Sequence, residues 1–221
     1  MMEKRYSYLI FTFDDGPRPV MPEIAAAFEK FGGKACFFVL GKNINEETAE
    51  YIRAVQSRGH EICNHGQNHS FGDEGYETVY DELQDGFLAI RSCLPDYRVE
   101  FYRSPGNRVN ENLLKVLEQE FSVCLINRTF SLRDWDAAGN NEADLLRLAD
   151  EQLEKGNFRD GAIINLHEVQ RTLNILPQLL KKLYDLGFRF CTLTEYLSIR
   201  GISLGRLPKN EPIRSLAEFR D

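Results

Sequence analysis

Short apolar runs alternate with longer segments in which apolar residues recur every three or four positions, from the start of the chain to about residue 192. Runs of the first kind are typical of buried strands, and segments of the second kind are typical of amphipathic helices. Strand and helix patterns that alternate in this way indicate repeated β-α units around a parallel sheet. The sequence therefore predicts an α/β fold.

About seven strands and six intervening helices are expected. The strands are Tyr6–Phe13, Ala35–Leu40, Glu61–Asn64, Glu100–Arg103, Ser122–Asn127, Ala162–Leu166 and Phe188–Thr192. The helices are Pro22–Phe31, Glu46–Arg58, Val79–Leu94, Glu111–Glu120, Ala143–Lys155 and Leu176–Leu186. Glycines follow three of these helices, at positions 32, 59 and 187, where a left-handed cap is common. With 221 residues the chain fits one such domain, expected over residues 1–200, and residues 201–221 are expected to form a tail that packs on it or extends from it.

The charge and the apolar content limit the partners. A net charge of −7 leaves no basic surplus for binding a nucleic acid or an anionic membrane surface. No apolar stretch is long enough to span a membrane, and the first residues lack the pattern expected of a signal peptide. The cysteines are odd in number, and most lie in apolar runs, so they are expected to be buried thiols: Cys36, Cys63, Cys93, Cys124 and Cys191. A cytoplasmic location is therefore expected, without nucleic acid or membrane partners.

Two adjacent carboxylates, Asp14 and Asp15, follow the first strand. The carboxyl ends of parallel strands are where α/β barrels hold their active sites. Neighbouring, partly desolvated carboxylates repel each other, so a cation or a shared proton must compensate them. The alternative is an Asp-Gly turn that only leads into the next helix.

Two histidines, His65 and His69, follow the third strand, four positions apart. Imidazole suits Zn²⁺ and similar metals, and a carboxylate from Asp14 or Asp15 would complete a site with an open position. Two surface histidines at this spacing also arise by chance. His60 lies before the strand and is expected to pack or cap instead.

Polar residues end the other strands too. Arg103 precedes Ser-Pro-Gly-Asn, and His167 follows Asn165 and Leu166. Asp134 comes after the fifth strand, next to Trp135, the only tryptophan of the chain. A single tryptophan or a single Arg-x-Pro is usually structural, but the joint placement at strand ends indicates a site.

The run Thr-Phe-Asp-Asp-Gly-Pro at residues 12–17 resembles the first motif of the polysaccharide deacetylases, the NodB-homology group of carbohydrate esterases (family 4). The later motifs follow in the order of that family, and the resemblance covers roughly Tyr8 to Leu197. It implies a distorted (β/α) barrel of about seven β-α units, related to the TIM barrel, with its site at the carboxyl ends of the strands. It also implies hydrolysis of a linear amide and a role in carbohydrate metabolism.

The resemblance implies four catalytic residues. Asp14 is expected to be the base that takes a proton from water, and Arg103 to orient it. His167 is expected to be the general acid that protonates the leaving amine, held in place by Asp134.

The resemblance also implies a metal and a substrate pocket. Asp15, His65 and His69 are expected to bind a divalent ion, Zn²⁺ first, with Co²⁺ or Ni²⁺ as alternatives. The remaining residues are expected to contact substrate: Gly106, whose N–H would stabilise an oxyanion, and Trp135, Asn165 and Leu166.

Three positions depart from the family pattern. Gly66 replaces the usual Ser or Thr that braces the metal loop, which predicts a looser loop. Asn165 replaces a leucine of the acyl pocket, which predicts a preference for a smaller or more polar acyl group. Ser131 replaces an acidic residue, with no assignable effect.

Three functions remain open at this point. The first is a deacetylase of an N-acetylated amino sugar or short oligosaccharide of the chitin or peptidoglycan type. The second is another C–N hydrolase of the same fold, a deformylase or an amidase, suggested by Asn165. The third is an inactive carbohydrate-binding protein, which the joint presence of the acidic, histidine and arginine residues disfavours. The oligomeric state is not predicted.

Overall fold

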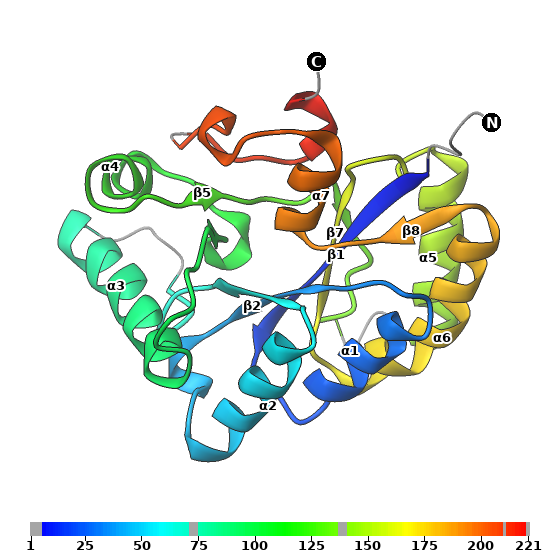
Figure 1. Cartoon of the computed structure of the whole chain (residues 1–221), viewed down its shortest axis with the longest axis horizontal. Coiled ribbons are helices and arrows are strands. Elements are labelled where there is room, and N and C mark those ends of the chain that lie inside the picture. The colour runs from blue at the N-terminus through cyan, green and yellow to red at the C-terminus, as the bar shows by residue number, and fades with distance from the viewer. Residues whose placement is uncertain (1–5, 71–74, 137–140, 210, 220–221) are drawn as a thin grey trace.

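A curled parallel sheet surrounded by helices forms the body of the molecule (Figure 1). The structure is a computed structural model that describes residues 6–70, 75–136, 141–209 and 211–219. The strands are β1 Ser7–Gly16, β2 Cys36–Val39, β3 Glu61–Asn64, β4 Phe101–Tyr102, β5 Cys124–Leu125, β6 Phe130–Ser131, β7 Ile163–His167 and β8 Phe188–Phe190. The helices are α1 Met21–Glu29, α2 Glu46–Ser57, α3 Tyr76–Cys93, α4 Glu111–Glu120, α5 Glu142–Glu154, α6 Gln170–Asp185 and α7 Leu193–Arg200. Short 3₁₀ turns are η1 Gly41–Asn43, η2 Pro105–Asn107, η3 Leu204–Arg206 and η4 Leu216–Phe219.

The strands follow the order β5-β4-β3-β2-β1-β7-β6, and β8 pairs with the beginning of β1. All of these pairs are parallel, so the carboxyl ends of the strands meet at one edge. The register places Asp14 beside His167 across β1 and β7. The predicted α/β fold with a distorted barrel is confirmed.

Two elements were not expected from the sequence. Strand β6 has only two residues, too few for a periodic signal. Helix α7 begins at a Thr192–Glu195 capping box, but its apolar residues do not gather on one face. Helix α6 also starts earlier than expected and continues through Pro177, because residues on both sides of the proline face the core.

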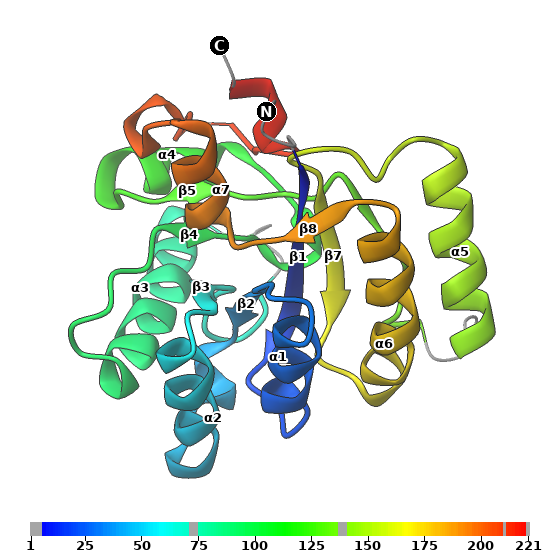
Figure 2. The ribbon, with the colours of Figure 1, turned by 45° about the vertical axis from the view of Figure 1, so that its right-hand side comes forward.

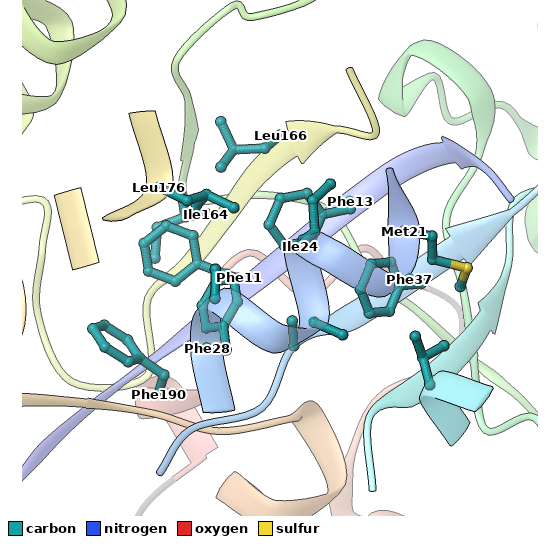
Figure 3. Packing of buried hydrophobic residues seen from close by; sticks show 14 of the residues in the cluster. Phe11, Phe13, Met21, Ile24, Phe28, Phe37, Ile164, Leu166, Leu176 and Phe190 are labelled. Carbon is teal, nitrogen blue, oxygen red and sulfur yellow. The ribbon is translucent and has the colours of Figure 1, made fainter. Parts of the chain in front are cut away.

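The alternation of side chains along β1 separates the core from the site. Phe11 and Phe13 point outward and pack with Phe28 of α1, as Figure 3 shows. Leu9 belongs to the same buried cluster. The alternate residues of β1 point into the barrel. Ile10 joins a second apolar cluster there, and Asp14 lies at the carboxyl-end edge. A single strand thus supplies both the core and a buried carboxylate.

Residues after 200 contact the barrel. Ile213 and Leu216 are buried, and Ile213 forms a bridge with Ile126 after β5. The N–H of Leu216 donates to the Gly161 carbonyl, and the N–H of Gly161 donates to the carbonyl of Tyr8 at the start of β1. Figure 2 shows this C-terminal segment near the start of β1, at the opposite end of that strand from Asp14.

All five cysteines are buried and free, as the sequence predicts. Among the described residues, no helix combines the length and the apolar character needed to cross a membrane.

Candidate active site

The carboxyl ends of the strands and the loops after them enclose a pocket of about 360 Å³, within the range of small-molecule sites. Its lining comes from six separate segments of the chain and comprises Asp14, Asp15, His65, His69, Gly106, Asn107, Arg128, Trp135, Asn165 and His167. The structure therefore brings together most of the residues that the sequence predicts for the site.

Asp15, His65 and His69 form a three-ligand cluster. The Oδ1 atom of Asp15 lies 3.5 Å from Nε2 of His65 and 3.3 Å from Nε2 of His69, and one ligand atom from each residue lies within 4.8 Å of the others. Asp15 in β1 and His69 in the loop after β3 both adopt a positive φ, a strained conformation that is found most often at functional sites.

The protonation of His65 suits a metal ligand. Its Nδ1 lies 2.8 Å from the Arg103 carbonyl oxygen, which only accepts, so Nδ1 carries the proton and Nε2 offers a lone pair. Burial lowers the pKa of His65 and outweighs the negative charges of Asp14 and Asp15, which would raise it, so the neutral ring is favoured. The Oδ1 atom of Asp15 is buried without a hydrogen-bond partner among the described residues. An acceptor facing two imidazoles with no donor fits a divalent cation.

The loop that carries His69 is braced by Glu82 of α3. The Glu82 carboxylate accepts hydrogen bonds from the backbone N–H groups of Asn68, at 2.6 Å, and of Ser70, at 3.1 Å. Gly66 has a φ of +89°, and a Cβ there would lie 2.8 Å from Oε1 of Glu82. The looser loop expected from Gly66 stays a prediction, and the structure adds a brace from Glu82 that the sequence did not indicate. The missing hydroxyl residue makes room for a carboxylate that provides the brace.

Asp14 is held from two sides. Its Oδ1 accepts from Nη1 of Arg103 at 2.7 Å, and its Oδ2 accepts from Nδ2 of Asn165 at 2.8 Å. Burial alone would raise the pKa of Asp14, but the charges of Arg103, His65 and His167 outweigh it and lower the pKa. Asp14 is therefore an anion whose position is fixed, although it is only 2% exposed.

His167 and Asp134 form a second ion pair at the pocket wall. Nδ1 of His167 lies 2.8 Å from Oδ1 of Asp134, and the His167 backbone N–H and the Thr172 hydroxyl both donate to Oδ2. Burial would lower the pKa of His167, but the hydrogen bond and charge of Asp134 raise it. The ring therefore holds its proton more strongly than a free histidine, with Nε2 pointing away from Asp134.

The remaining predicted contacts divide between pocket and core. Gly106, in η2 with a φ of +62°, and the exposed Trp135 both line the pocket. Asn165 also lines it, but Leu166 does not and lies in the hydrophobic core near Phe13 (Figure 3). The expected substrate contact of Leu166 was wrong, because successive residues of β7 point to opposite faces of the sheet.

Other residues have structural roles or were missed. His60 is buried, where Nδ1 accepts from the Ala35 N–H, as expected for a packing residue. Ser131 accepts from the Arg133 N–H and shapes the turn before Asp134. Sequence reasoning missed Arg128, because no motif marks an arginine in the loop after β5.

Glu168, beside the general-acid candidate, is another buried carboxyl. Its Oε2 accepts from the Arg18 N–H, while Oε1 has no partner among the described residues. Burial raises its pKa to about 8. A side chain at Gly16 would clash with Oε1 at 1.7 Å, which explains the glycine in the Asp-Asp-Gly-Pro motif.

The fold and the site define a class of hydrolase, and the family model for polysaccharide deacetylases matches residues 2–120. The chain belongs to this polysaccharide deacetylase family, the NodB-homology group of hydrolases that act on carbon–nitrogen bonds other than peptide bonds.

Individual relatives are similar over most of this chain. A peptidoglycan-N-acetylglucosamine deacetylase of Bacillus cereus is 25% identical over 86% of this chain and 87% of its own length. A bifunctional xylanase/deacetylase of Pseudobutyrivibrio xylanivorans is also 25% identical, over 88% of this chain, but the chain spans only 31% of that protein.

Two solved structures share the fold. The Xyl-CE4 domain of a multidomain xylanase from the hindgut metagenome of Trinervitermes trinervoides superposes with a TM-score of 0.83, at 24% identity over 98% of this chain and all of that domain. A family 4 acetyl xylan esterase of Clostridium thermocellum, in complex with a cobalt ion, gives a TM-score of 0.81 at 25% identity, over 95% of this chain and 98% of that one.

Proposed function

We propose that the protein is a metal-dependent deacetylase that hydrolyses the N-acetyl group of an amino sugar or short oligosaccharide of the chitin or peptidoglycan type. The observation that carries the proposal is the convergence, in one pocket, of an anionic Asp14, a three-ligand cluster and a His167–Asp134 pair. The name of the Bacillus cereus relative supports an N-acetylglucosamine substrate.

Asp15, His65 and His69 would hold the ion, and Zn²⁺ suits two imidazoles and one carboxylate. When bound, a divalent ion would act as a Lewis acid toward the acyl group. The cobalt ion in the Clostridium thermocellum esterase supports a divalent metal in this fold.

The protein groups divide the proton transfers between them. Asp14 takes a proton from the attacking water as the water oxygen bonds to the acyl carbon, and Arg103 keeps the Asp14 carboxylate in place. The Gly106 N–H stabilises the negative charge that develops on the acyl oxygen. His167 then gives its proton to the nitrogen as the C–N bond breaks, which releases acetate and a free amine.

The test is acetate release from N-acetylglucosamine oligosaccharides by the zinc-loaded protein, with two variants. Asp14→Asn should lose activity and keep its metal, because the Asp14 carboxylate is engaged by Arg103 and Asn165. Asp15→Ala removes a metal ligand and should lose both activity and metal. Equal metal contents in the two variants would contradict the separate roles. Full activity after complete metal removal would overturn the metal dependence.

A second candidate is a deformylase or another small-molecule amidase of the same fold. The polar amide of Asn165 in the pocket wall is the observation that favours it. Parallel assays of N-formylated and N-acetylated amino sugars separate the two candidates.

A further inference from the structure

Arg128 brings a positive charge into the pocket that neither the proposed metal site nor the proton transfers use. It lies in the loop between β5 and β6, is half-buried, and lines the same cavity as Asp14 and His167. Arg103, in contrast, is engaged by Asp14, the Thr12 hydroxyl and the Asn127 carbonyl.

The Arg128 guanidinium has no ion-pair or hydrogen-bond partner in the described part of the chain. Asp14 attracts the Arg128 guanidinium electrostatically, but both Asp14 oxygens already accept hydrogen bonds from Arg103 and Asn165. Burial, together with repulsion from Arg103, lowers the pKa of Arg128. A half-buried cation without a counter-ion is costly, and an anionic ligand would relieve that cost.

The backbone on both sides of Arg128 is fixed. The N–H of Asn127 donates to the Ile213 carbonyl at 2.7 Å, and the Asn127 carbonyl accepts from Arg103. The N–H of Thr129 donates to the Ile163 carbonyl at 2.8 Å. Arg128 is therefore presented from a preorganised loop, which reduces the entropy that ligand binding must offset.

We propose that Arg128 sets substrate specificity by binding a carboxylate carried by the N-acylated sugar substrate. This inference rests on the proposed deacetylase function and narrows its substrate to acidic amino sugars. A carboxylate fits because one guanidinium balances a single negative charge and meets its two oxygens with two parallel N–H groups.

The experiment compares three oligosaccharides of N-acetylglucosamine. The first is neutral. In the second, the sugar that loses its acetyl group also carries a carboxylate, attached through an ether as in N-acetylmuramic acid. In the third, the neighbouring sugar carries the carboxylate. Of the two acidic substrates, one should be turned over better by the unaltered protein. On that substrate Arg128→Gln should lower kcat/KM about 10- to 100-fold, the worth of a hydrogen bond between charged groups. On the neutral substrate the loss should be less than about 3-fold. The loss should appear mainly in KM, because the carboxylate takes no part in bond breaking and Arg128 would bind it equally in the ground state and the transition state.

Two further variants control the result. Arg128→Lys keeps the charge and should retain part of the preference for the acidic substrate, whereas Arg214→Gln removes a charge from an exposed neighbouring residue and should leave that preference unchanged. An equal loss on all three sugars in Arg128→Gln, with metal content intact, overturns the inference and leaves the deacetylase function standing. No turnover of any of the sugars by the unaltered protein overturns the proposed function itself.

Discussion

His167 has the surroundings of a proton donor rather than of a metal ligand. Burial would lower the pKa of His167, but Asp134 accepts a hydrogen bond from its Nδ1 and raises that pKa, which favours the acid form of the ring. A positioned acid contributes about 10²- to 10⁴-fold to rate. We therefore expect His167→Ala to bind metal normally and to lose about this factor on an N-acetyl substrate. An activated ester, whose leaving group needs no proton, should lose less, and equal losses on both substrates would exclude the acid role.

The same pair predicts the alkaline side of the pH profile. Since the pKa of His167 is raised, the acid form persists above the ordinary range of histidine and activity should decline only as pH exceeds that raised value. Asp134→Asn removes the charge that raises the pKa, so the alkaline limb of kcat/KM should move to lower pH. A profile that only drops in height, without moving, would show that Asp134 acts on stability alone.

Asn165 acts on Asp14 through a hydrogen bond of 2.8 Å and lies at the pocket wall at the same time. Because its Nδ2 already donates to Asp14, we expect Asn165→Leu to leave one carboxylate oxygen poorly satisfied and to lower kcat about 10-fold on acetyl and formyl substrates alike. Comparing the rates on acetyl and formyl substrates shows whether Asn165 holds Asp14 or selects the acyl group. A ratio of acetyl to formyl turnover that rises 10-fold would instead assign Asn165 to acyl selection.

At the scale of elements, the ends of strands were the predictable part of the site. Asp14 lies near the end of β1, His65 and Arg103 follow strands, and His167 ends one. Parallel strands bring their carboxyl ends to one edge, so sequence order alone predicts that these residues meet. Glu82 was not predictable in this way. It lies in the middle of α3, where an acidic residue is usually solvated, and only the approach of the helix to the metal loop buries it.

Glu82 joins helix α3 to the metal ligands, which makes the helix part of the site. Glu82→Gln removes the anion that accepts from the Asn68 and Ser70 N–H groups, so the His69 loop should loosen. Groups that orient ligands from behind are worth about 10- to 100-fold in metal affinity. Competition with a chelator should show a loss of this size, whereas Glu77→Gln, an exposed position on the same helix, should show none.

Gly66 and Glu82 are fitted to each other in this chain, so that a side chain at position 66 would be strained. At a φ of +89°, with Glu82 Oε1 2.8 Å from a built Cβ, Gly66→Ser should weaken metal binding rather than restore a brace. The combination with Glu82→Ala should be less harmful than the sum of the two single changes, because the clash is removed. Additive losses in chelator competition would show that the two positions act independently.

At the scale of the whole molecule, the end of the barrel opposite the site is held by Asp160. Its Oδ1 accepts from the Tyr8 N–H at 2.7 Å and from Arg200, and its Oδ2 accepts from the Tyr196 hydroxyl at 2.6 Å. These contacts join the start of β1 to α7, and the adjacent Gly161 carbonyl receives the Leu216 N–H. Asp160 therefore links the first strand, the last helix and the segment after residue 200.

This linkage predicts a stability that depends on pH. Burial alone would raise the pKa of Asp160, but its bonds to Arg200, Tyr196 and Tyr8 lower it, so the folded pKa lies below the ordinary 3.8. The stabilisation is therefore complete above the unfolded pKa and is lost as pH falls through the folded one. We expect Asp160→Asn to reduce the free energy of unfolding by about 1–3 kcal/mol at pH 7, the worth of partly buried hydrogen bonds to a charged group. In urea titrations, this difference from the unaltered protein should shrink toward zero at strongly acidic pH.

Asp150→Asn is the control. It breaks an exposed pair with Lys182 and should cost less than about 1 kcal/mol, both at pH 7 and at strongly acidic pH. An Asp160→Asn deficit that persists unchanged in acid would mean that shape, and not the charge of Asp160, holds this end of the barrel together.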